Sequence, residues 1–324
     1  MKTVLVTGAD GFVGRNLCPY LKSRDLSVRG SVVEIKTSPC LLDGVEYVET
    51  GFMTQHTDWQ PALKDVDVVV HLAARVHIMQ ETAADPLLEF RKVNVVPTLQ
   101  LAKQAAQAGV KKFVFMSTVK VNGEGDSQLK RAIYKESDPA NPQDAYGLSK
   151  LEAEKQLSII SQETGMQLIT IRPPLIYGPG VGANFLKLIN LVQKGLPLPF
   201  SIIRNKRSFL YVENLADAIY NICIKDINTN DVFFVSDQND MSIAELVKVI
   251  ATVSHRNVFL MPLPGSLLRV AAKLLGKADM ISRLVDSLVV DTAKIKSTLN
   301  WHAPYSVLQG LTKTIAWHEA QIKK

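Results

Sequence analysis

Residues 3–14 read TVLVTGADGFVG, an apolar run that leads directly into three spaced glycines. The run predicts a buried strand, and each glycine that follows meets a different steric need. Gly8 permits a tight turn, Gly11 lets the backbone approach a pyrophosphate, and Gly14 lets the next helix pack close to the strand. Free N–H groups at the start of that helix favour phosphates. The stretch therefore predicts a dinucleotide site formed by Gly8, Gly11, Phe12, Val13 and Gly14.

Apolar runs alternate with amphipathic stretches across the first half of the chain. Short, continuously apolar runs are typical of strands that are covered on both faces. The alternation predicts an α/β fold with a Rossmann-like, doubly wound parallel sheet. We expect strands at 3–7, 28–33, 66–71, 112–117 and 167–172, and helices at 12–24, 86–108 and 144–164.

After residue 177 the pattern loosens into helices separated by loops that contain proline or glycine. We expect these helices near 184–195, 213–225, 241–253 and 305–321, and a late strand near 232–235 that returns to the sheet. The sequence thus predicts a dinucleotide-binding domain over residues 1–177. A smaller, mostly C-terminal α/β substrate lobe, interleaved with the first domain, is expected over residues 178–324.

Composition narrows the class of protein. The chain has 324 residues, 47% of them hydrophobic, and a net charge of +6 from 37 basic and 31 acidic residues. The basic residues are scattered, which favours small anionic ligands over nucleic acid. No apolar run is long enough for stable membrane insertion, the N-terminus lacks a cleavage signal, and the three cysteines lack a CxxC spacing. These features predict a cytoplasmic protein with reduced thiols. The six histidines form no cluster, so we expect no metal site.

Tyr146 and Lys150 are four residues apart in a predicted helix and therefore share one face. A free phenol has a pKa of roughly 10 and is a poor base at neutral pH. A nearby ammonium group should lower that pKa. The phenol can then exchange a proton with a substrate oxygen while hydride moves to or from a nicotinamide. A pair at this spacing also occurs by chance on helix surfaces, so its position in the fold decides its meaning.

The stretch MSTVKVNGE, residues 116–124, ends a predicted strand with the hydroxyls of Ser117 and Thr118. Either hydroxyl can line an active site or simply cap the strand. The capping alternative is more plausible for Ser117 than for Thr118.

Further motifs follow the glycine turn in order along the chain. They are GxxGxxG at 8–14, HLAA at 71–74, Asn94, IRPP at 171–174, IYGPG at 176–180 and RSFLYVENLADAI from Arg207. Together they resemble the extended short-chain dehydrogenase/reductase family, of the NAD-dependent epimerase/dehydratase type, over essentially the whole chain. The resemblance implies catalysis by Tyr146, Lys150 and Thr118. It also implies an NAD or NADP site that adds Glu34, Leu72, Ala73, Ala74, Ser117, Tyr146, Lys150 and Pro173 to the glycine turn.

The residues after Thr118 bear on the reaction that the resemblance implies. Nucleotide-sugar 4,6-dehydratases of this family carry Asp-Glu there, because eliminating water needs an additional acid and base. Here the residues are Val119 and Lys120, so dehydration is disfavoured. Epimerisation at C4, or reduction of a 4-keto sugar, remains.

Three segments, at 71–79, 117–124 and 172–185, are similar to a bacterial polysaccharide subgroup. Its members resemble reductases of UDP-4-keto-6-deoxy-N-acetylhexosamine, which make UDP-N-acetylquinovosamine, and also UDP-glucose 4-epimerase-like proteins. Typical 4-epimerases carry a tyrosine where this chain has Asn122. We therefore expect a 4-ketoreductase of surface polysaccharide (O-antigen) synthesis. A UDP-hexose 4-epimerase is the alternative. The third hypothesis, a redox-sensing protein without chemistry, is disfavoured because Thr118, Tyr146 and Lys150 are all present.

The choice between NAD and NADP usually depends on an acid at the end of the second strand. Val32 falls there, Glu34 follows two residues later and can equally be a solvated loop charge, and Phe52 replaces the family's adenine-side aspartate. The resemblance further implies that Arg207 contacts the substrate diphosphate and Asn184 its nucleotide. Arg283 is a second candidate cation.

Two expectations concern surfaces. The resemblance implies a homodimer through the helices at 86–108 and 144–164. The stretch PGSLLRVAAKLLGKA, residues 264–278, is basic and amphipathic and could touch a membrane. We interpret it instead as a helix packed on the core of the lobe.

Overall fold

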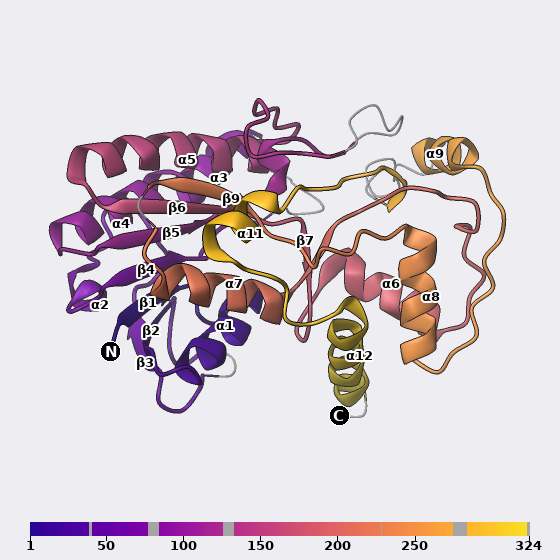
Figure 1. Ribbon diagram of the computed structural model, residues 1–324, viewed down its shortest axis with the longest axis horizontal. Coiled ribbons are helices and arrows are strands. Elements are labelled where there is room, and N and C mark those ends of the chain that lie inside the picture. The colour runs from indigo at the N-terminus through magenta and orange to yellow at the C-terminus, as the bar shows by residue number, and fades with distance from the viewer. Residues whose placement is uncertain (39–40, 77–83, 126–132, 228, 275–283, 323–324) are drawn as a thin grey trace.

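Seven parallel strands form the central sheet of the described chain, in the order β3-β2-β1-β4-β5-β6-β9 (Figure 1). The computed structural model describes all residues except 39–40, 77–83, 126–132, 228, 275–283 and 323–324. The predicted doubly wound parallel sheet is confirmed. The strands are Thr3–Thr7 (β1), Ser27–Val32 (β2), Glu46–Glu49 (β3), Val68–His71 (β4), Lys112–Met116 (β5), Gln167–Arg172 (β6) and Asp231–Phe234 (β9).

Helices cover both faces of the sheet. On one face α1 (Phe12–Lys22) packs against α7 (Val212–Ile224). On the other face α4 (Val96–Gln107) packs against the short helix α2 (Gln60–Leu63) and against α5 (Ala145–Thr164). The strands supply apolar side chains to both layers, as β1 shows: Val4 and Val6 belong to the cluster with α1 and α7, and Leu5 to the cluster with α4 and α5.

The helix predicted over residues 86–108 is divided into α3 (Pro86–Asn94) and α4. The break lies at Val95, two residues before Pro97. Proline has no N–H for the helical hydrogen bond, and its ring collides with the preceding turn, so a continuous helix cannot pass this point. Asn94 uses the break: its Oδ1 accepts from the N–H of Arg75 at 2.8 Å and its Nδ2 donates to Ser149 Oγ at 3.1 Å. The residue thus ties the segment after β4 to helix α5.

The smaller lobe is built from the second half of the chain and has its own apolar cluster. The two-stranded sheet in it, β7 with β8, was not predicted, because each strand has only three residues. Its elements are β7 (Leu175–Tyr177), α6 (Ala183–Gln193), β8 (Phe209–Tyr211), α8 (Ile243–Val253), α9 (Gly265–Leu274) and α12 (Val307–Ile322). The remaining described elements are the 3₁₀ turn η1 (Val119–Val121) and α11 (Ala293–Leu299).

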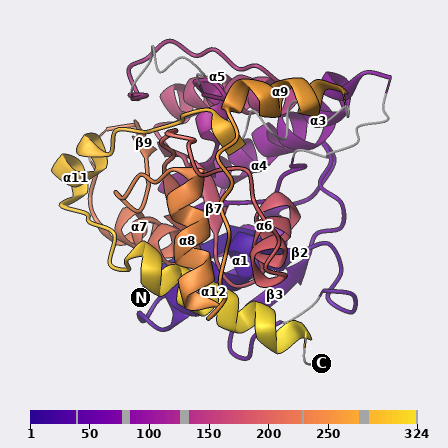
Figure 2. The same cartoon turned by 90° about the vertical axis from the view of Figure 1, so that its right-hand side faces the viewer.

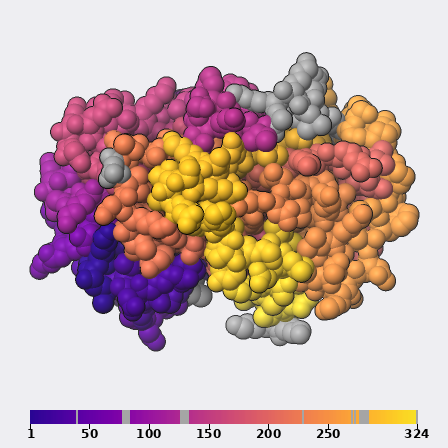
Figure 3. All heavy atoms as spheres, in the orientation of Figure 1, coloured from indigo at the N-terminus to yellow at the C-terminus, as the bar shows by residue number. Residues whose placement is uncertain are grey.

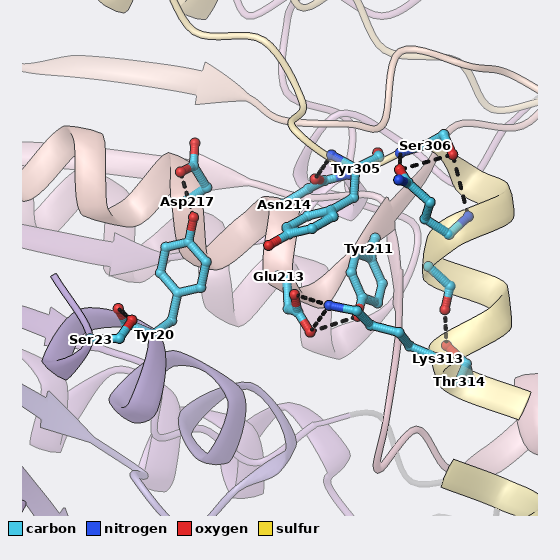
Figure 4. A network of polar contacts seen from close by, with 12 residues as sticks. Tyr20, Ser23, Tyr211, Glu213, Asn214, Asp217, Tyr305, Ser306, Lys313 and Thr314 are labelled. Atoms are coloured by element: carbon cyan, nitrogen blue, oxygen red, sulfur yellow. Dashed lines mark hydrogen bonds and ion pairs between the residues drawn. The ribbon is translucent and has the colours of Figure 1, made fainter. Parts of the chain in front are cut away.

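Polar contacts connect the C-terminal segment to the sheet layer (Figure 4). Asp217 on α7 accepts hydrogen bonds from the hydroxyl of Tyr20 on α1, at 2.5 Å, and from Nε1 of Trp301, at 2.8 Å. Asn214 exchanges two bonds with the backbone of Tyr305, at 2.8 and 2.9 Å. The predicted late strand is present as β9, which pairs with β6. A strand from the second half of the chain thus belongs to the sheet, whereas the division into two interleaved domains at residue 177 stays a prediction.

The strand order reverses at β1, which lies between β2 and β4. In open α/β sheets, ligands bind beyond the carboxyl ends of the strands at this point. There the hydroxyl of Thr7 accepts the N–H groups of Leu72 and Ala73, each at 3.2 Å, and lies 2.7 Å from Nδ1 of His71. Because the two N–H groups occupy both lone pairs of the Thr7 hydroxyl, its own proton is donated to Nδ1 of His71. The proton of the His71 ring is then on Nε2, which donates to Thr98 Oγ1 at 2.8 Å. His71 is fully buried, and burial, reinforced by the Lys150 charge, lowers its pKa to about 3.

We predict that His71 makes the protein less stable in mild acid. The unfolded chain takes up a proton near the ordinary value of 6.5, whereas the folded chain takes it up only near 3. The stabilisation that neutral His71 contributes to the folded state is thus fully present above pH 6.5. It is lost as the pH falls, by about 2 kcal/mol between pH 6.5 and about pH 5. Urea unfolding at several pH values should show a shallower decline in His71→Asn than in the unsubstituted protein. The exposed His302→Asn should retain the full decline. Equal declines in all three proteins would contradict this role.

Candidate active site

Five of the residues predicted from the sequence line one cavity of about 490 Å³, namely Phe12, Thr118, Tyr146, Asn184 and Arg207. They come from the start of α1, the segment after β5, the start of α5, the start of α6 and the segment before β8. The cavity therefore lies where the carboxyl ends of the sheet strands meet the smaller lobe. Apolar side chains, among them Leu175, Ile176 and Leu288, form the rest of its wall.

Thr118 and Tyr146 reach the cavity from neighbouring elements. Thr118 caps η1, where its hydroxyl accepts the N–H of Lys120 at 3.3 Å. Tyr146 lies in the first turn of α5, whose start is fixed by Asp144 through a 2.7 Å bond from the N–H of Gly147. The ring of Tyr146 packs near Phe90 of α3, with 5.8 Å between the centroids. Packing and the cap thus hold both hydroxyls at one wall.

The predicted effect of Lys150 on Tyr146 is not seen. Burial, with a contribution from the Asp144 charge, raises the pKa of Tyr146 above its ordinary value. Lys150 itself is buried; burial lowers its pKa to about 7, although the Glu154 charge opposes the shift. Its Nζ donates to the carbonyl of Met116 at 2.9 Å and lies 4.7 Å from the centre of the Phe115 ring. The expected lowering of the phenol pKa is therefore not found in this arrangement, because burial of the phenol and the nearby Asp144 charge both act in the opposite direction.

The glycine turn has the shape that phosphates require. Gly8 has a φ of +65°, and a Cβ on Gly14 would lie 2.4 Å from the Gly8 carbonyl oxygen. A Cβ on Gly8 would come within 3.0 Å of the Ala73 backbone, so the strand end that follows His71 lies directly over the turn. No side chain caps the start of α1. The N–H groups of its first turn are thus available to a pyrophosphate, and the residues fit a dinucleotide cofactor.

Ser117 lies next to the cavity segment but faces the other way. Its hydroxyl donates to Glu154, which also forms a buried ion pair with Arg172. Nη1 of Arg172 donates to Oδ1 of Asn122 at 3.0 Å, and Asn122 is fully buried. The hydroxyl predicted to face the cofactor is therefore engaged in a structural network. Asn122, on which the ketoreductase reading depended, belongs to the same network and does not line the cavity.

The remaining predicted cofactor contacts surround the turn. Leu72, Ala73 and Ala74 follow β4, while Pro173 follows β6 and accepts the N–H of Val119 at 3.0 Å, which fixes the segment after Thr118. Glu34 is exposed in the loop after β2, where its carboxylate accepts from the Thr37 hydroxyl at 3.0 Å. Its contact with a ribose stays a prediction.

The substrate side of the cavity combines a cation with a helix start. Arg207 is half-buried and its Nη1 donates to the Asp286 carbonyl at 2.9 Å. Asn184 lies in the first turn of α6, whose start carries no side-chain cap, and its buried Oδ1 has no hydrogen-bond partner among the described residues. Both features suit an anionic, hydrogen-bonding ligand. Arg283, the second predicted cation, lies outside the described residues.

Sequence reasoning overlooked two charged cavity residues, Lys120 and Glu124. Lys120 pairs with Glu124 at 2.5 Å and with Asp144 at the cap of α5. The position of Lys120 two residues after Thr118 was the available signal.

The model of the NAD dependent epimerase/dehydratase family matches residues 4–235, so the chain belongs to this family. A UDP-glucose 4-epimerase from Vibrio cholerae is 42% identical over 315 residues, which are 97% of this chain and 94% of the relative. The fold is shared with the UDP-glucuronic acid 4-epimerase of Bacillus cereus, solved with NAD (TM-score 0.80, 21% identity, 99% and 100% of the two chains). It is also shared with the UDP-N-acetylglucosamine 4-epimerase of Methanobrevibacter ruminantium (TM-score 0.79, 22% identity, 99% of both chains).

The family assignment confirms the predicted resemblance and the predicted class, an NAD(P)-dependent enzyme of the epimerase/dehydratase type. Among the residues that the structure describes, no helix is long and apolar enough to cross a bilayer. Within the same residues no group of three acidic, histidine or cysteine side chains is placed to hold a metal ion.

We predict that the buried network is more important for stability than a comparable ion pair on the surface. Glu154→Gln leaves the Arg172 guanidinium buried without its counter-charge, which should cost about 3 kcal/mol or more. Glu152→Gln, two residues earlier on α5, breaks the exposed pair with Arg91 and should cost less than about 1 kcal/mol. Denaturant unfolding of the two variants measures the difference. Similar losses would show that Arg172 does not depend on Glu154.

We predict that Gly14→Ala weakens cofactor binding. The added Cβ would meet backbone atoms of Gly8 and Ala9 and push α1 away from the turn. Because overpacking of this kind costs roughly 1–3 kcal/mol, binding of NADH should weaken about tenfold or more in a fluorescence titration. Gly265→Ala, where the Cβ finds ordinary contact distance at 3.4 Å, is the control and should bind normally. Unchanged affinity in Gly14→Ala would place the cofactor elsewhere.

Proposed function

We propose that this protein is a UDP-hexose 4-epimerase that uses NAD or NADP. The observation that carries the proposal is the single cavity that brings Thr118 and Tyr146 together with Arg207 and Asn184. The 42% identical Vibrio cholerae relative, a UDP-glucose 4-epimerase, supports epimerisation over the 4-ketoreductase that the sequence led us to expect. The burial of Asn122 removes the main argument for the ketoreductase, because the substitution at that position does not alter the cavity wall.

Tyr146 and Thr118 have the central roles in this reaction. A bound nicotinamide would supply the hydride acceptor and donor for C4. Tyr146 takes the proton from the 4-hydroxyl and gives it back, and Thr118 hydrogen-bonds to the same oxygen. With its raised pKa, the phenol is protonated at neutral pH, so it is ready to donate. Its action as a base requires additional positive charge near the ring, for which Lys150, with a pKa of about 7, is the protein's own source.

The nucleotide end of the substrate would lie along the smaller lobe. Arg207 supplies a planar cation for the diphosphate, and the uncapped start of α6 supplies backbone N–H groups. The Asn184 amide, whose oxygen has no partner among the described residues, can accept from the uracil ring. Two further expectations keep their status as predictions: location in the cytoplasm and a role in surface polysaccharide synthesis.

A homodimer through α3, α4 and α5 also remains a prediction. These helices expose Leu88, Val96 and Ile159 by 46%, 41% and 46%, apolar surface that a second copy would cover.

We predict that Tyr146→Phe abolishes turnover and leaves the fold intact. Removal of one acid–base hydroxyl should lower kcat by roughly 10²–10⁴-fold. Binding of NADH, measured by fluorescence, should change little. Tyr220→Phe on α7, outside the residues that line the cavity, is the matched control and should turn over normally. Retention of full activity in Tyr146→Phe would refute the assignment.

The reaction itself is tested with purified protein. Interconversion of UDP-glucose and UDP-galactose without consumption of cofactor is the expected result. Stoichiometric loss of NADPH with a UDP-4-keto-6-deoxy sugar, and no hexose interconversion, would instead restore the ketoreductase. Absence of both reactions, with intact cofactor binding, would support a redox-sensing protein.

A further inference from the structure

One end of the smaller lobe exposes a group of large apolar side chains from segments far apart in the sequence. We call this group the distal patch; it consists of Leu196, Ile202, Phe259, Met261, Leu267, Val270 and Leu274. Phe259 is 65% exposed and Leu274 83%. Residues 259–274, which carry five of these side chains, are drawn in orange at the right of Figure 3, at the end of the molecule farthest from the sheet. Solvent-exposed apolar groups of this kind mark interaction surfaces.

Hydrogen bonds hold the two loop segments of the distal patch side by side. The N–H of Leu198 donates to the Phe259 carbonyl at 2.9 Å, and the N–H of Met261 donates to the Leu198 carbonyl at 2.8 Å. Leu198 and Leu260 belong to the core cluster of the lobe or pack against it. Because side chains alternate along an extended chain, Phe259 and Met261 are directed outward. Their exposure is therefore built into the backbone pairing.

Helix α9 continues this surface, and Figure 2 shows it along one edge of the same end. Among the side chains of the helix that the structure describes, Leu268 alone belongs to the core cluster. Leu267, Val270 and Leu274 are spaced three and four residues apart, so they form one stripe, and all three are exposed. Our interpretation of this stretch as a helix packed on the lobe's core holds for Leu268 but is wrong for the stripe. These three apolar side chains are directed outward, whereas an ordinary surface helix turns such a stripe to the core.

The segments that carry the distal patch are cationic. Residues 181–212 and 246–274 contain no aspartate or glutamate at all. Exposed basic side chains next to the patch residues in the sequence include Lys194, Arg204, Arg256 and Lys273. An exposed apolar stripe with flanking Lys and Arg, and without acids, complements a negatively charged bilayer surface.

We propose that the distal patch docks the protein on the surface of a bilayer that contains anionic phospholipids, with α9 lying in the plane of the interface. The apolar stripe enters the boundary of the acyl chains while the cations contact the headgroups. A second copy of the chain is a poorer occupant, because a two-fold contact would place the same cations against one another. Docking requires no turnover, so the failure of the proposed enzymatic function would leave it unaffected.

The test is flotation of the full-length protein with phosphatidylcholine vesicles, with and without phosphatidylglycerol. We expect binding to the anionic vesicles alone, and release by salt. Leu267→Gln/Leu274→Gln should lower the partition coefficient more than about tenfold, since each leucine contributes several CH₂ groups. Lys273→Glu should lower it roughly fivefold or more, because each basic residue contributes about that factor. Matched controls are Leu308→Gln on α12 and Lys103→Glu on α4, which are exposed elsewhere and should bind as the unsubstituted protein does.

The leucine variants should keep full turnover of the soluble nucleotide sugar, which shows that the fold is intact. Absence of binding to anionic vesicles, or binding that the patch variants do not alter, would overturn the proposal. Sedimentation of the same variants examines the rival occupant. A change of oligomeric state in Leu267→Gln/Leu274→Gln, without vesicle binding by the unsubstituted protein, would assign the patch to a second copy of the chain.

Discussion

The close backbone approach between the start of α1 and the turn after β1 determines where the rest of the site can lie. Gly14 lies against the Gly8 carbonyl at a distance that no Cβ can occupy, and Ala73 covers Gly8 from the neighbouring strand. This double contact places the uncapped start of a helix at the point where strand order reverses. A phosphate-sized anion is favoured there by geometry and by the helix dipole together. Buried hydrogen bonds between Thr7, at the end of β1, and His71 and Leu72, at the end of β4, hold these two strand ends together.

The polar residues near the cavity form two groups, one that is paired within the protein and one that faces the cavity. Ser117, Glu154, Arg172 and Asn122 satisfy one another and form a rigid support behind β5. Thr118, the next residue after Ser117, faces the cavity instead. The two neighbouring hydroxyls therefore divide between structure and chemistry, as successive side chains at a strand end point to opposite sides.

The electrostatics of Tyr146 and Lys150 are set by the same burial. A protonated phenol and a lysine near half-charge are a different starting point from the phenolate–ammonium pair that the spacing alone suggested. In this arrangement Lys150 donates a hydrogen bond to the backbone carbonyl of Met116 at the end of β5, and its lowered pKa leaves it only partly charged at neutral pH. The protein thus favours the acid form of the tyrosine until positive charge is added near the ring.

The sequence by itself determined the strand–turn–helix start and the parallel sheet, because glycine spacing and apolar periodicity are local properties. The family resemblance, not periodicity, implied Thr118, Asn184 and Arg207 as site residues, and it supported Tyr146, which its spacing from Lys150 had suggested. It could not show the short strands β3, β7 and β8, whose pairing depends on partners far along the chain. Only the tertiary structure decided that Ser117 and Asn122 turn inward, that Lys120 faces the cavity and that the α9 stripe faces out. Each of these is a choice between two sides of one element, and that choice is made by the neighbours packed against it.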